Sequence, residues 1–250
     1  MDITDQIALV TGANRGIGRQ FVAELLERGA RKVYATARRP DLLEASGLSG
    51  LAGASWVSGA SGVEVLTLDI TDHDSIRAAA AAASDVTLLV NNAGISTSTP
   101  LLTGDRAEIR REMDTHFWGT LDMIRAFAPV LAANGGGGIV NVLSALSWFV
   151  SPGNGAYAAA KAAAWNMTNG VRLELAGQGT LVQAVHLAAA DTDMTAGYDV
   201  LKIDPRDVAR ASLDGLVAGA IEILADEPSA FVKASLAGDP TAFYAMVLAG

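Results

Sequence analysis

Short runs of consecutive apolar residues alternate along the chain with longer stretches of helical periodicity. Seven runs have the length of strands, and they are Ile7–Val10, Lys32–Ala37, Val63–Leu68, Val86–Val90, Ile139–Leu143, Leu181–Leu187 and Ala220–Leu224. Because these runs lack polar alternation, they indicate strands that are buried on both faces of a parallel sheet.

The longer stretches predict the helices that cover this sheet. They are Gly16–Arg28, Asp72–Ala83, Asp105–Ala133, Asn154–Gly177 and Pro205–Val217. The alternation of strand and helix favours right-handed crossovers. We therefore predict an α/β fold in which residues 1–250 form a single domain, a Rossmann-like, doubly wound parallel sheet of about seven strands with helices on both faces.

Two segments rich in small residues interrupt the pattern. Residues 45–62 predict a loop insertion between the second and third strands, either pinned to the body by Trp56 or mobile. Gly135–Gly138 predicts a flexible turn before the fifth strand.

Composition and charge exclude several classes of function. Hydrophobic residues make up 50% of the chain and the formal net charge is −9, so we expect a sizeable core and neither a nucleic-acid nor an anionic membrane partner. The absence of cysteine excludes disulfides and thiol nucleophiles, and the three histidines lack ligand spacing, so we expect no metal. We see no signal-peptide pattern and no bilayer-length apolar run, and we expect a cytoplasmic protein.

A glycine-rich turn, TGANRGIG at residues 11–18, lies between the first strand and the first helix. Glycines allow the backbone to approach a ligand closely, and the N–H groups at a helix start favour a pyrophosphate. A structural turn without a ligand is the alternative. The candidate cofactor contacts in this turn are Gly12, Asn14, Gly16, Ile17 and Gly18.

The residues after the second strand discriminate between two nicotinamide cofactors. An acidic residue there would favour NAD, but the strand ends in Ala37-Arg38-Arg39. Guanidinium groups suit a 2′-phosphate, and Arg15 in the glycine turn offers a second cation. The sequence thus predicts NADP(H), with solvated arginines as the alternative.

Ser144, Tyr157 and Lys161 carry the candidate catalytic chemistry. Residues four apart on a helix share a face, so the Tyr157 hydroxyl and the Lys161 ammonium are expected to converge. A cation about 4 Å away stabilises a phenolate by roughly 4 kcal/mol at an effective dielectric of 20, which predicts a lowered pKa for Tyr157. Such a phenol exchanges a proton with a carbonyl or alcohol oxygen at neutral pH. A surface lysine above a half-buried tyrosine is the alternative.

Taken together, these residues resemble the short-chain dehydrogenase/reductase family, and its NADP-preferring carbonyl reductases in particular. TGANRGIG is similar to the family's cofactor motif, Asn91-Asn92-Ala93-Gly94 to its NNAG element, and the Ser, Tyr and Lys stand at its catalytic spacing. The resemblance implies hydride transfer between NADP(H) and a ketone or secondary alcohol. Further cofactor contacts that it implies are Asp69, Ile70, Asn91, Ala93, Gly94, Tyr157, Lys161 and Thr192.

The resemblance also gives each catalytic residue a role. Ser144 would hydrogen-bond the substrate oxygen, Tyr157 would exchange the proton, and Lys161 would hold the nicotinamide ribose. His116 stands where family members usually have an asparagine that supports a proton relay. Imidazole both donates and accepts, so His116 is a fourth catalytic candidate, with a core histidine as the alternative. Leu187-Ala188 replaces the usual Pro-Gly, which predicts a differently shaped backbone beside the nicotinamide.

The residues expected near the substrate are apolar or aromatic, namely Leu146, Trp148, Met194 and Tyr198. They favour a broad range of hydrophobic carbonyl substrates under a short lid at residues 194–204. Trp148 alternatively belongs to the core or to an interface. Two other functions stay open, a non-catalytic NADP-binding regulatory protein and an epimerase or dehydratase of the same fold. Family members commonly form dimers or tetramers, so we expect a homo-oligomer.

Overall fold

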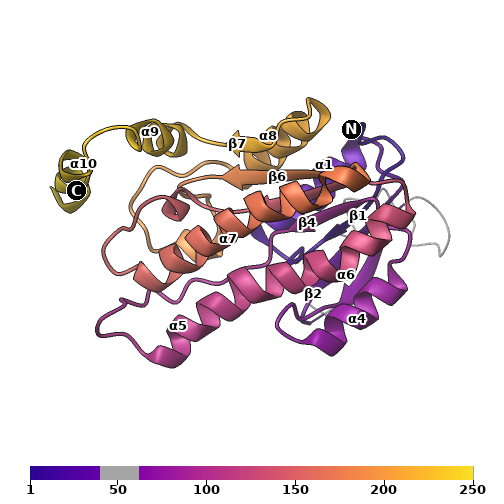
Figure 1. Ribbon diagram of the computed structural model, residues 1–250, viewed down its shortest axis with the longest axis horizontal. Coiled ribbons are helices and arrows are strands. Elements are labelled where there is room, and N and C mark those ends of the chain that lie inside the picture. Colours follow the sequence, from indigo (N-terminus) through magenta and orange to yellow (C-terminus); the bar gives the residue numbers. More distant parts are fainter. Residues whose placement is uncertain (40–61, 250) are drawn as a thin grey trace.

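A seven-stranded parallel sheet runs through the centre of the computed structural model, which describes residues 1–39 and 62–249 (Figure 1). The strand order is β3-β2-β1-β4-β5-β6-β7, and every neighbouring pair is parallel. The bounds are β1 Ile7–Val10, β2 Lys32–Ala37, β3 Gly62–Thr67, β4 Leu88–Asn91, β5 Gly138–Val142, β6 Leu181–His186 and β7 Glu222–Leu224. The predicted doubly wound α/β fold is confirmed, and the order reverses between β1 and β4, where ligands bind in such sheets.

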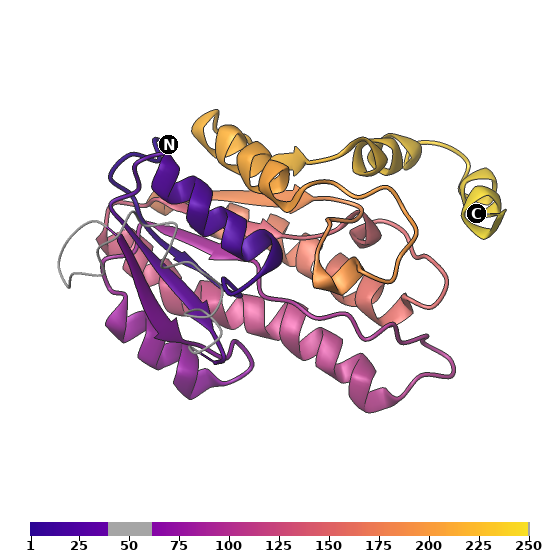
Figure 2. The ribbon, with the colours of Figure 1, turned by 180° about the vertical axis from the view of Figure 1, so that it is seen from behind.

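Helices cover both faces of the sheet (Figures 1 and 2). One face carries α1 (Gly16–Glu27) and α8 (Pro205–Val217), and the other carries α4 (His73–Ala82), α5 (Arg106–Met113), α6 (Thr120–Ala133) and α7 (Gly155–Leu175). Successive residues of a strand point to opposite faces, so β1 feeds two cores. Ala8 and Val10 pack with Phe21 of α1, whereas Leu9 packs with Phe127 of α6.

The predicted single helix over 105–133 is interrupted, which corrects the sequence prediction. A π-helical turn, η1, occupies Asp114–Gly119 between α5 and α6. Gly119 lies so close to the chain after β3 that a Cβ atom there would be 2.7 Å from the Ile70 carbonyl oxygen. A π turn inserts one residue into a helix and is frequent at functional sites. Here it changes which side chains of this helix face the sheet ends.

The glycine run before β5 is packed from Gly136 onward, which corrects its prediction as a flexible turn, while Gly135 has open space around it. Gly138 already belongs to β5, and Gly137 has a φ of +86°. A Cβ atom on Gly137 would lie 2.1 Å from the Thr87 carbonyl oxygen. Glycine is therefore required at this position by both backbone conformation and close approach.

The edges of the sheet differ from its centre. The residues of β3 are half-buried or exposed, so burial on both faces was a wrong prediction for this edge strand. β7 is shorter than predicted and begins at Glu222. Residues 45–61 of the predicted insertion, with Trp56, lie outside the described residues, and Gly62 belongs to β3.

Two C-terminal helices that the hydrophobic pattern did not predict follow β7. They are α9 (Glu227–Ser235) and α10 (Pro240–Ala249), and they extend away from the sheet (Figure 1). Within the described ranges, no helix has both the length and the apolar character needed to cross a membrane.

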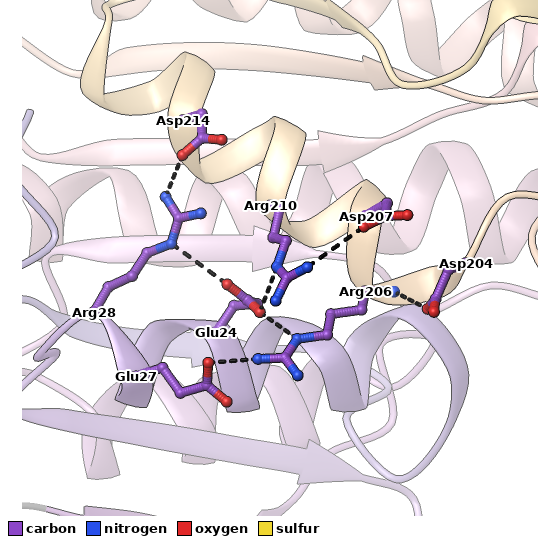
Figure 3. A network of polar contacts seen from close by, with 8 residues as sticks. All are labelled: Glu24, Glu27, Arg28, Asp204, Arg206, Asp207, Arg210 and Asp214. Carbon is purple, nitrogen blue, oxygen red and sulfur yellow. Dashed lines mark hydrogen bonds and ion pairs between the residues drawn. The ribbon is translucent and has the colours of Figure 1, made fainter.

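An ionic network joins α1 to α8 on one face of the sheet (Figure 3). The buried Glu24 carboxylate pairs with Arg206, with Arg210 at 3.0 Å and with Arg28 at 3.6 Å. Burial raises the pKa of Glu24, but the hydrogen bonds and charges of Arg206 and Arg210 outweigh it and hold the pKa below its ordinary value. The network contributes to the stability of this face and lies apart from the candidate catalytic residues.

Candidate active site

The glycine turn after β1 packs closely against the chain that follows β4. A Cβ atom on Gly18 would lie 2.3 Å from the Gly12 carbonyl oxygen, and one on Gly12 would lie 3.0 Å from the Ala93 Cα. Arg15 precedes α1 without a side-chain cap, and no acidic residue stands in the first turn of this helix. N–H groups of this kind attract an anionic ligand. Asn14 and Ile17 are half-buried in the same turn.

Thr11 ties the NNAG element to the glycine turn. Its Oγ1 accepts hydrogen bonds from the backbone N–H groups of Asn92 and Ala93, each at 2.9 Å. The Asn91 side chain donates to Asn141 Oδ1 at 2.8 Å, which links the ends of β4 and β5. The predicted cofactor residues on these elements thus gather at one end of the sheet.

The remaining predicted cofactor residues border this end of the sheet. Arg38 is exposed immediately after β2, and Ile70 is buried beside Asp69, whose carboxylate accepts from the Thr71 backbone at 2.9 Å. Thr192 approaches the glycine turn, because a Cβ atom on Gly16 would lie 3.1 Å from its Cγ2. Arg15 forms an exposed ion pair with Asp193 at 3.1 Å, a partner that the spacing of the motif did not indicate.

The three catalytic candidates meet where β5 ends. Ser144 follows β5, and Tyr157 and Lys161 lie in the first two turns of α7. The Lys161 Nζ donates to the Val142 carbonyl at 2.9 Å and lies 5.6 Å from the centre of the Tyr157 ring. The Ser144 Oγ accepts from the Leu146 N–H at 3.1 Å. Tyr157 and Lys161 therefore share a helix face, as predicted, but the ammonium is directed to a backbone carbonyl.

The pKa values of this pair correct the predicted acidification of the phenol. Burial raises the pKa of Tyr157, the hydrogen bond with Ser144 opposes this rise, and the charges of Glu112 and Tyr198 add to it. Burial lowers the pKa of Lys161 to about 8. Lys161 is not among the groups that shift the pKa of Tyr157, and desolvation sets its direction. The spacing of two residues on a helix did not reveal how deeply either is buried.

His116 lies in the π turn, buried against the candidate catalytic residue Tyr157. Its ring meets the Tyr157 ring edge-on, with centres 5.2 Å apart, and a Cβ atom on Gly94 would lie 2.7 Å from its Cε1. The His116 Nε2 is 2.9 Å from the Ile95 carbonyl oxygen and 3.2 Å from Glu112 Oε2. Sequence reasoning missed Glu112. The available signal was its position four residues before His116, on the same helix face.

The residues predicted for the substrate pocket divide into two groups. Trp148 stacks on His186 with ring centres 3.9 Å apart, and Lys233 lies 4.6 Å above the Trp148 ring. These contacts favour the core interpretation of Trp148. Leu146 is half-buried beside Ser144, and Met194 and Tyr198 are exposed on the segment predicted as a lid. The Tyr198 hydroxyl is 3.3 Å from Ser98 Oγ.

Two further observations concern the chemistry of this end of the sheet. The Leu187 carbonyl accepts from the Ala145 N–H at 2.8 Å, and the Ala188 N–H donates to Asp226 at 2.8 Å, so the chain after β6 is held on both sides. Among residues 1–39 and 62–249, no group of three or more His, Asp or Glu side chains is arranged to hold a metal ion.

Comparisons with known proteins agree with this geometry. A family model described as short chain dehydrogenase matches residues 6–200. An uncharacterized oxidoreductase of Staphylococcus aureus is 31% identical over 221 residues, which cover 86% of this chain and 92% of that protein. A crystal structure of a short chain dehydrogenase from Burkholderia cenocepacia in complex with NADP is 39% identical, with a TM-score of 0.89 over 99% of each chain. A bulky-bulky ketone specific alcohol dehydrogenase from Comamonas testosteroni is 25% identical, with a TM-score of 0.76 over 88% of this chain and 86% of that one.

Proposed function

The chain belongs to the short-chain dehydrogenase family, a family of oxidoreductases, and from that premise we propose that it is an NADP(H)-dependent carbonyl reductase. It transfers a hydride between NADP(H) and a ketone or secondary alcohol. The observation that carries the proposal is the convergence of Ser144, Tyr157 and Lys161 at the end of β5, beside the glycine turn.

The described residues fit such a cofactor. The start of α1 has no side-chain cap, and Gly12 and Gly18 lie where no Cβ atom would fit. The pyrophosphate would lie at this helix start, and the exposed Arg38 would bind the 2′-phosphate with Arg15 beside it. The NADP in the Burkholderia cenocepacia protein supports the choice of cofactor. When bound, NADPH supplies the hydride to the carbonyl carbon.

The catalytic residues handle the oxygen and the proton. The Ser144 hydroxyl donates a hydrogen bond to the substrate carbonyl oxygen, which stabilises the negative charge that develops there. Tyr157 gives its proton to the same oxygen, so that the ketone becomes an alcohol and the phenol a phenolate. Lys161, whose pKa of about 8 lies near neutrality, stabilises that phenolate and is suited to pass a proton to it. The raised pKa of Tyr157 keeps the phenol protonated before each turnover.

The substrate is an apolar carbonyl compound in this proposal. Leu146, Met194 and Tyr198 offer one hydroxyl and no charge, which disfavours a phosphorylated or carboxylated substrate. The ketone specificity of the Comamonas testosteroni relative supports the same class. Residues 194–204 would cover the substrate as a short lid.

The test follows NADPH consumption with a panel of aryl and alkyl ketones, repeated with NADH. We expect turnover with NADPH preferred, and Tyr157→Phe should lower kcat about 10²–10⁴-fold while the Kd for NADPH stays within about twofold. The matched comparison is Tyr244→Phe, which changes an exposed tyrosine on α10.

Three outcomes would contradict the proposal. Product formation without net consumption of cofactor indicates an epimerase or dehydratase. Tight NADPH binding without turnover on any ketone indicates a regulatory protein. Near-normal kcat in Tyr157→Phe removes the phenol from the mechanism.

A further inference from the structure

A fully buried carboxylate lies one helical turn from His116. The Glu112 side chain is 0% exposed, and its Oε1 accepts from the Thr97 backbone N–H at 2.6 Å and from the Thr97 hydroxyl at 2.8 Å. Its Oε2 makes no hydrogen bond to a described residue and has His116 Nε2 at 3.2 Å. Within the described part of the chain, no lysine or arginine pairs with it. A charge buried in this way is costly to keep, so its position calls for an explanation in the chemistry of the site.

The contacts of the His116 ring fix the place of its proton. Both atoms beside Nε2 are acceptors, the Ile95 carbonyl oxygen at 2.9 Å and the Glu112 carboxylate at 3.2 Å. Two acceptors around one ring nitrogen require that nitrogen to carry the proton. Burial and the charge of Lys161 lower the pKa of His116, so the ring is neutral at neutral pH. Its single proton is on Nε2, and its lone pair is on Nδ1.

The ring lies within the candidate site. It lies edge-on to Tyr157, and both Lys161 and Glu112 act on its charge state. Glu112 also raises the pKa of Tyr157 and opposes the lowering of the Lys161 pKa. One buried carboxylate thus acts on every proton-exchanging group of the candidate site. By contrast, Glu108, one turn earlier on α5, is partly exposed and pairs with Arg111 at 3.1 Å.

We propose that Glu112 is a positioning residue that, with the Ile95 carbonyl, holds His116 in the tautomer whose Nδ1 accepts a proton or hydrogen bond within the active site. The inference rests on the proposed function for its catalytic consequence, but the tautomer itself does not depend on turnover. Glu112 takes no proton and touches no substrate in this arrangement. Its positioning role is exerted through His116, whereas its charge also acts on Tyr157 and Lys161.

Replacing Glu112 with glutamine places a donor where the carboxylate Oε2 faces the ring, 3.2 Å from His116 Nε2. The amide oxygen still accepts from Thr97, but the new NH₂ group faces the His116 Nε2–H, and two donors cannot bond each other. The Ile95 carbonyl still favours a proton on Nε2, so the two neighbours of Nε2 now oppose each other, and the fraction of rings with the proton on Nδ1 rises. In that fraction Nδ1 donates, so the acceptor is lost from the active site while the packing volume is kept.

The first experiment reads the tautomer directly, by ¹⁵N NMR of the histidine side chains in the cofactor-free protein. His116→Asn identifies the His116 signals among the three histidines of the chain. We expect a protonated Nε2 and an unprotonated Nδ1 in the wild type, and a larger fraction with a protonated Nδ1 in Glu112→Gln. A protonated Nδ1 in the wild type overturns the inference, even if the protein reduces ketones, and this spectrum needs no variant of Glu112 to fold.

The second experiment measures ketone reduction in Glu112→Gln, His116→Asn, the double variant and the control Glu108→Gln. Glu112→Gln should lower kcat about 10–10²-fold with the KM for NADPH within about twofold, and Glu108→Gln should match the wild type. In the His116→Asn background the Glu112 substitution should lose the part of its effect that passes through the imidazole, so the two losses should be clearly less than additive. Additive losses would show that Glu112 acts by another route and overturn the proposal.

Discussion

Glu24 and Glu112 are both buried glutamates on helices, one on each face of the sheet, and they differ in what surrounds them (Figures 1 and 2). Glu24 faces three guanidinium groups from α1 and α8 (Figure 3). Glu112 faces the donors of Thr97 and a neutral imidazole. Hydrogen bonds outweigh burial at both sites, and the pKa of each carboxyl lies below its ordinary value.

The difference shows that the buried charge of Glu24 serves the stability of the fold, whereas that of Glu112 acts on the groups of the candidate site. The negative charge of Glu24 is matched by cations beside it, and it contributes to no pKa shift among the catalytic candidates. The charge of Glu112 is held by neutral donors, so its field reaches Tyr157, Lys161 and His116. A carboxylate that keeps its charge without a cation is a better marker of a functional site than one inside an ion-pair network.

The largest expected effect on stability comes from removing the negative charge of Glu24, which three arginines match. Glu24→Gln leaves three arginines facing one another, and we expect the free energy of unfolding to fall by about 3 kcal/mol, near the lower end of the range for a broken buried pair, because the arginines are partly exposed. Glu112→Gln keeps its hydrogen bonds to Thr97 and should cost about 1 kcal/mol. Urea denaturation of both variants checks the contrast, and the kcat of folded Glu24→Gln should equal that of the wild type.

A larger loss of stability in Glu112→Gln than in Glu24→Gln would contradict the comparison. A fall in kcat for Glu24→Gln would contradict it too, if the assay is done without urea at a temperature at which circular dichroism shows the variant to be fully folded. The first result would mean that Glu112 contributes more to stability than the Glu24 network, and the second that the charge on the α1–α8 face reaches the active site.

Acid titration separates the two regions by pH. His186 lies behind Ser144, with Nδ1 at 3.0 Å from the Ser144 carbonyl oxygen, and burial lowers its pKa from 6.5 to about 4. As the pH falls, His186 therefore binds a proton in the unfolded chain before it does so in the folded protein. The free energy of unfolding then decreases between pH 6.5 and about 4, by at most about 3 kcal/mol. Glu24, whose folded pKa is also lowered, loses its contribution only as the pH falls below its unfolded value of 4.5.

The measurement is the free energy of unfolding in urea at several pH values between 7 and 4.5, within the window set by the two pKa values of His186. His186→Asn keeps a donor toward the Ser144 carbonyl and should reduce the slope of stability against pH, although His116 retains a contribution of the same sign. His73→Asn, which replaces an exposed histidine, is the matched control for the loss of an imidazole. An equal slope in all three proteins would show that His186 is not buried as a neutral ring.

The sequence was sufficient to predict the features that depend on residues close together along the chain. The parallel sheet, the glycine turn and the shared helix face of Tyr157 and Lys161 follow from apolar runs, turn chemistry and helical periodicity. Gly137 was assigned to a flexible turn, because its approach to Thr87 joins residues fifty positions apart. Distant approaches of this kind leave no local pattern.

The candidate site was least predictable where burial decides the chemistry. The predicted direction of the Tyr157 pKa shift was wrong, since desolvation and the charge of Glu112 raise this pKa and exceed the opposing hydrogen bond with Ser144. In the sequence, Glu112 is indistinguishable from a charged residue on an exposed helix. Only the structure shows that Thr97, in the preceding loop, donates two hydrogen bonds to its carboxylate. The π turn that places His116 depends on the approach of Gly119 to Ile70, which the periodicity of the helix did not reveal.

The smallest expected effect comes from Arg210→Gln, which tests whether the three arginines share the pairing with the Glu24 carboxylate. Arg210 is half-exposed and bonds Glu24 at 3.0 Å, while Arg206 and Arg28 remain beside the same carboxylate when it is removed. Arg210→Gln should therefore lower the free energy of unfolding by only about 0.5–1 kcal/mol. Because exposed charges are screened within about 3 Å at 1 M salt, most of this difference should disappear when urea denaturation is repeated in 1 M NaCl.

The kcat loss of Glu112→Gln should persist in the same salt, since its carboxylate is fully buried. If salt instead abolished the kcat effect and left the Arg210 effect intact, the roles given to the two glutamates would have to be exchanged.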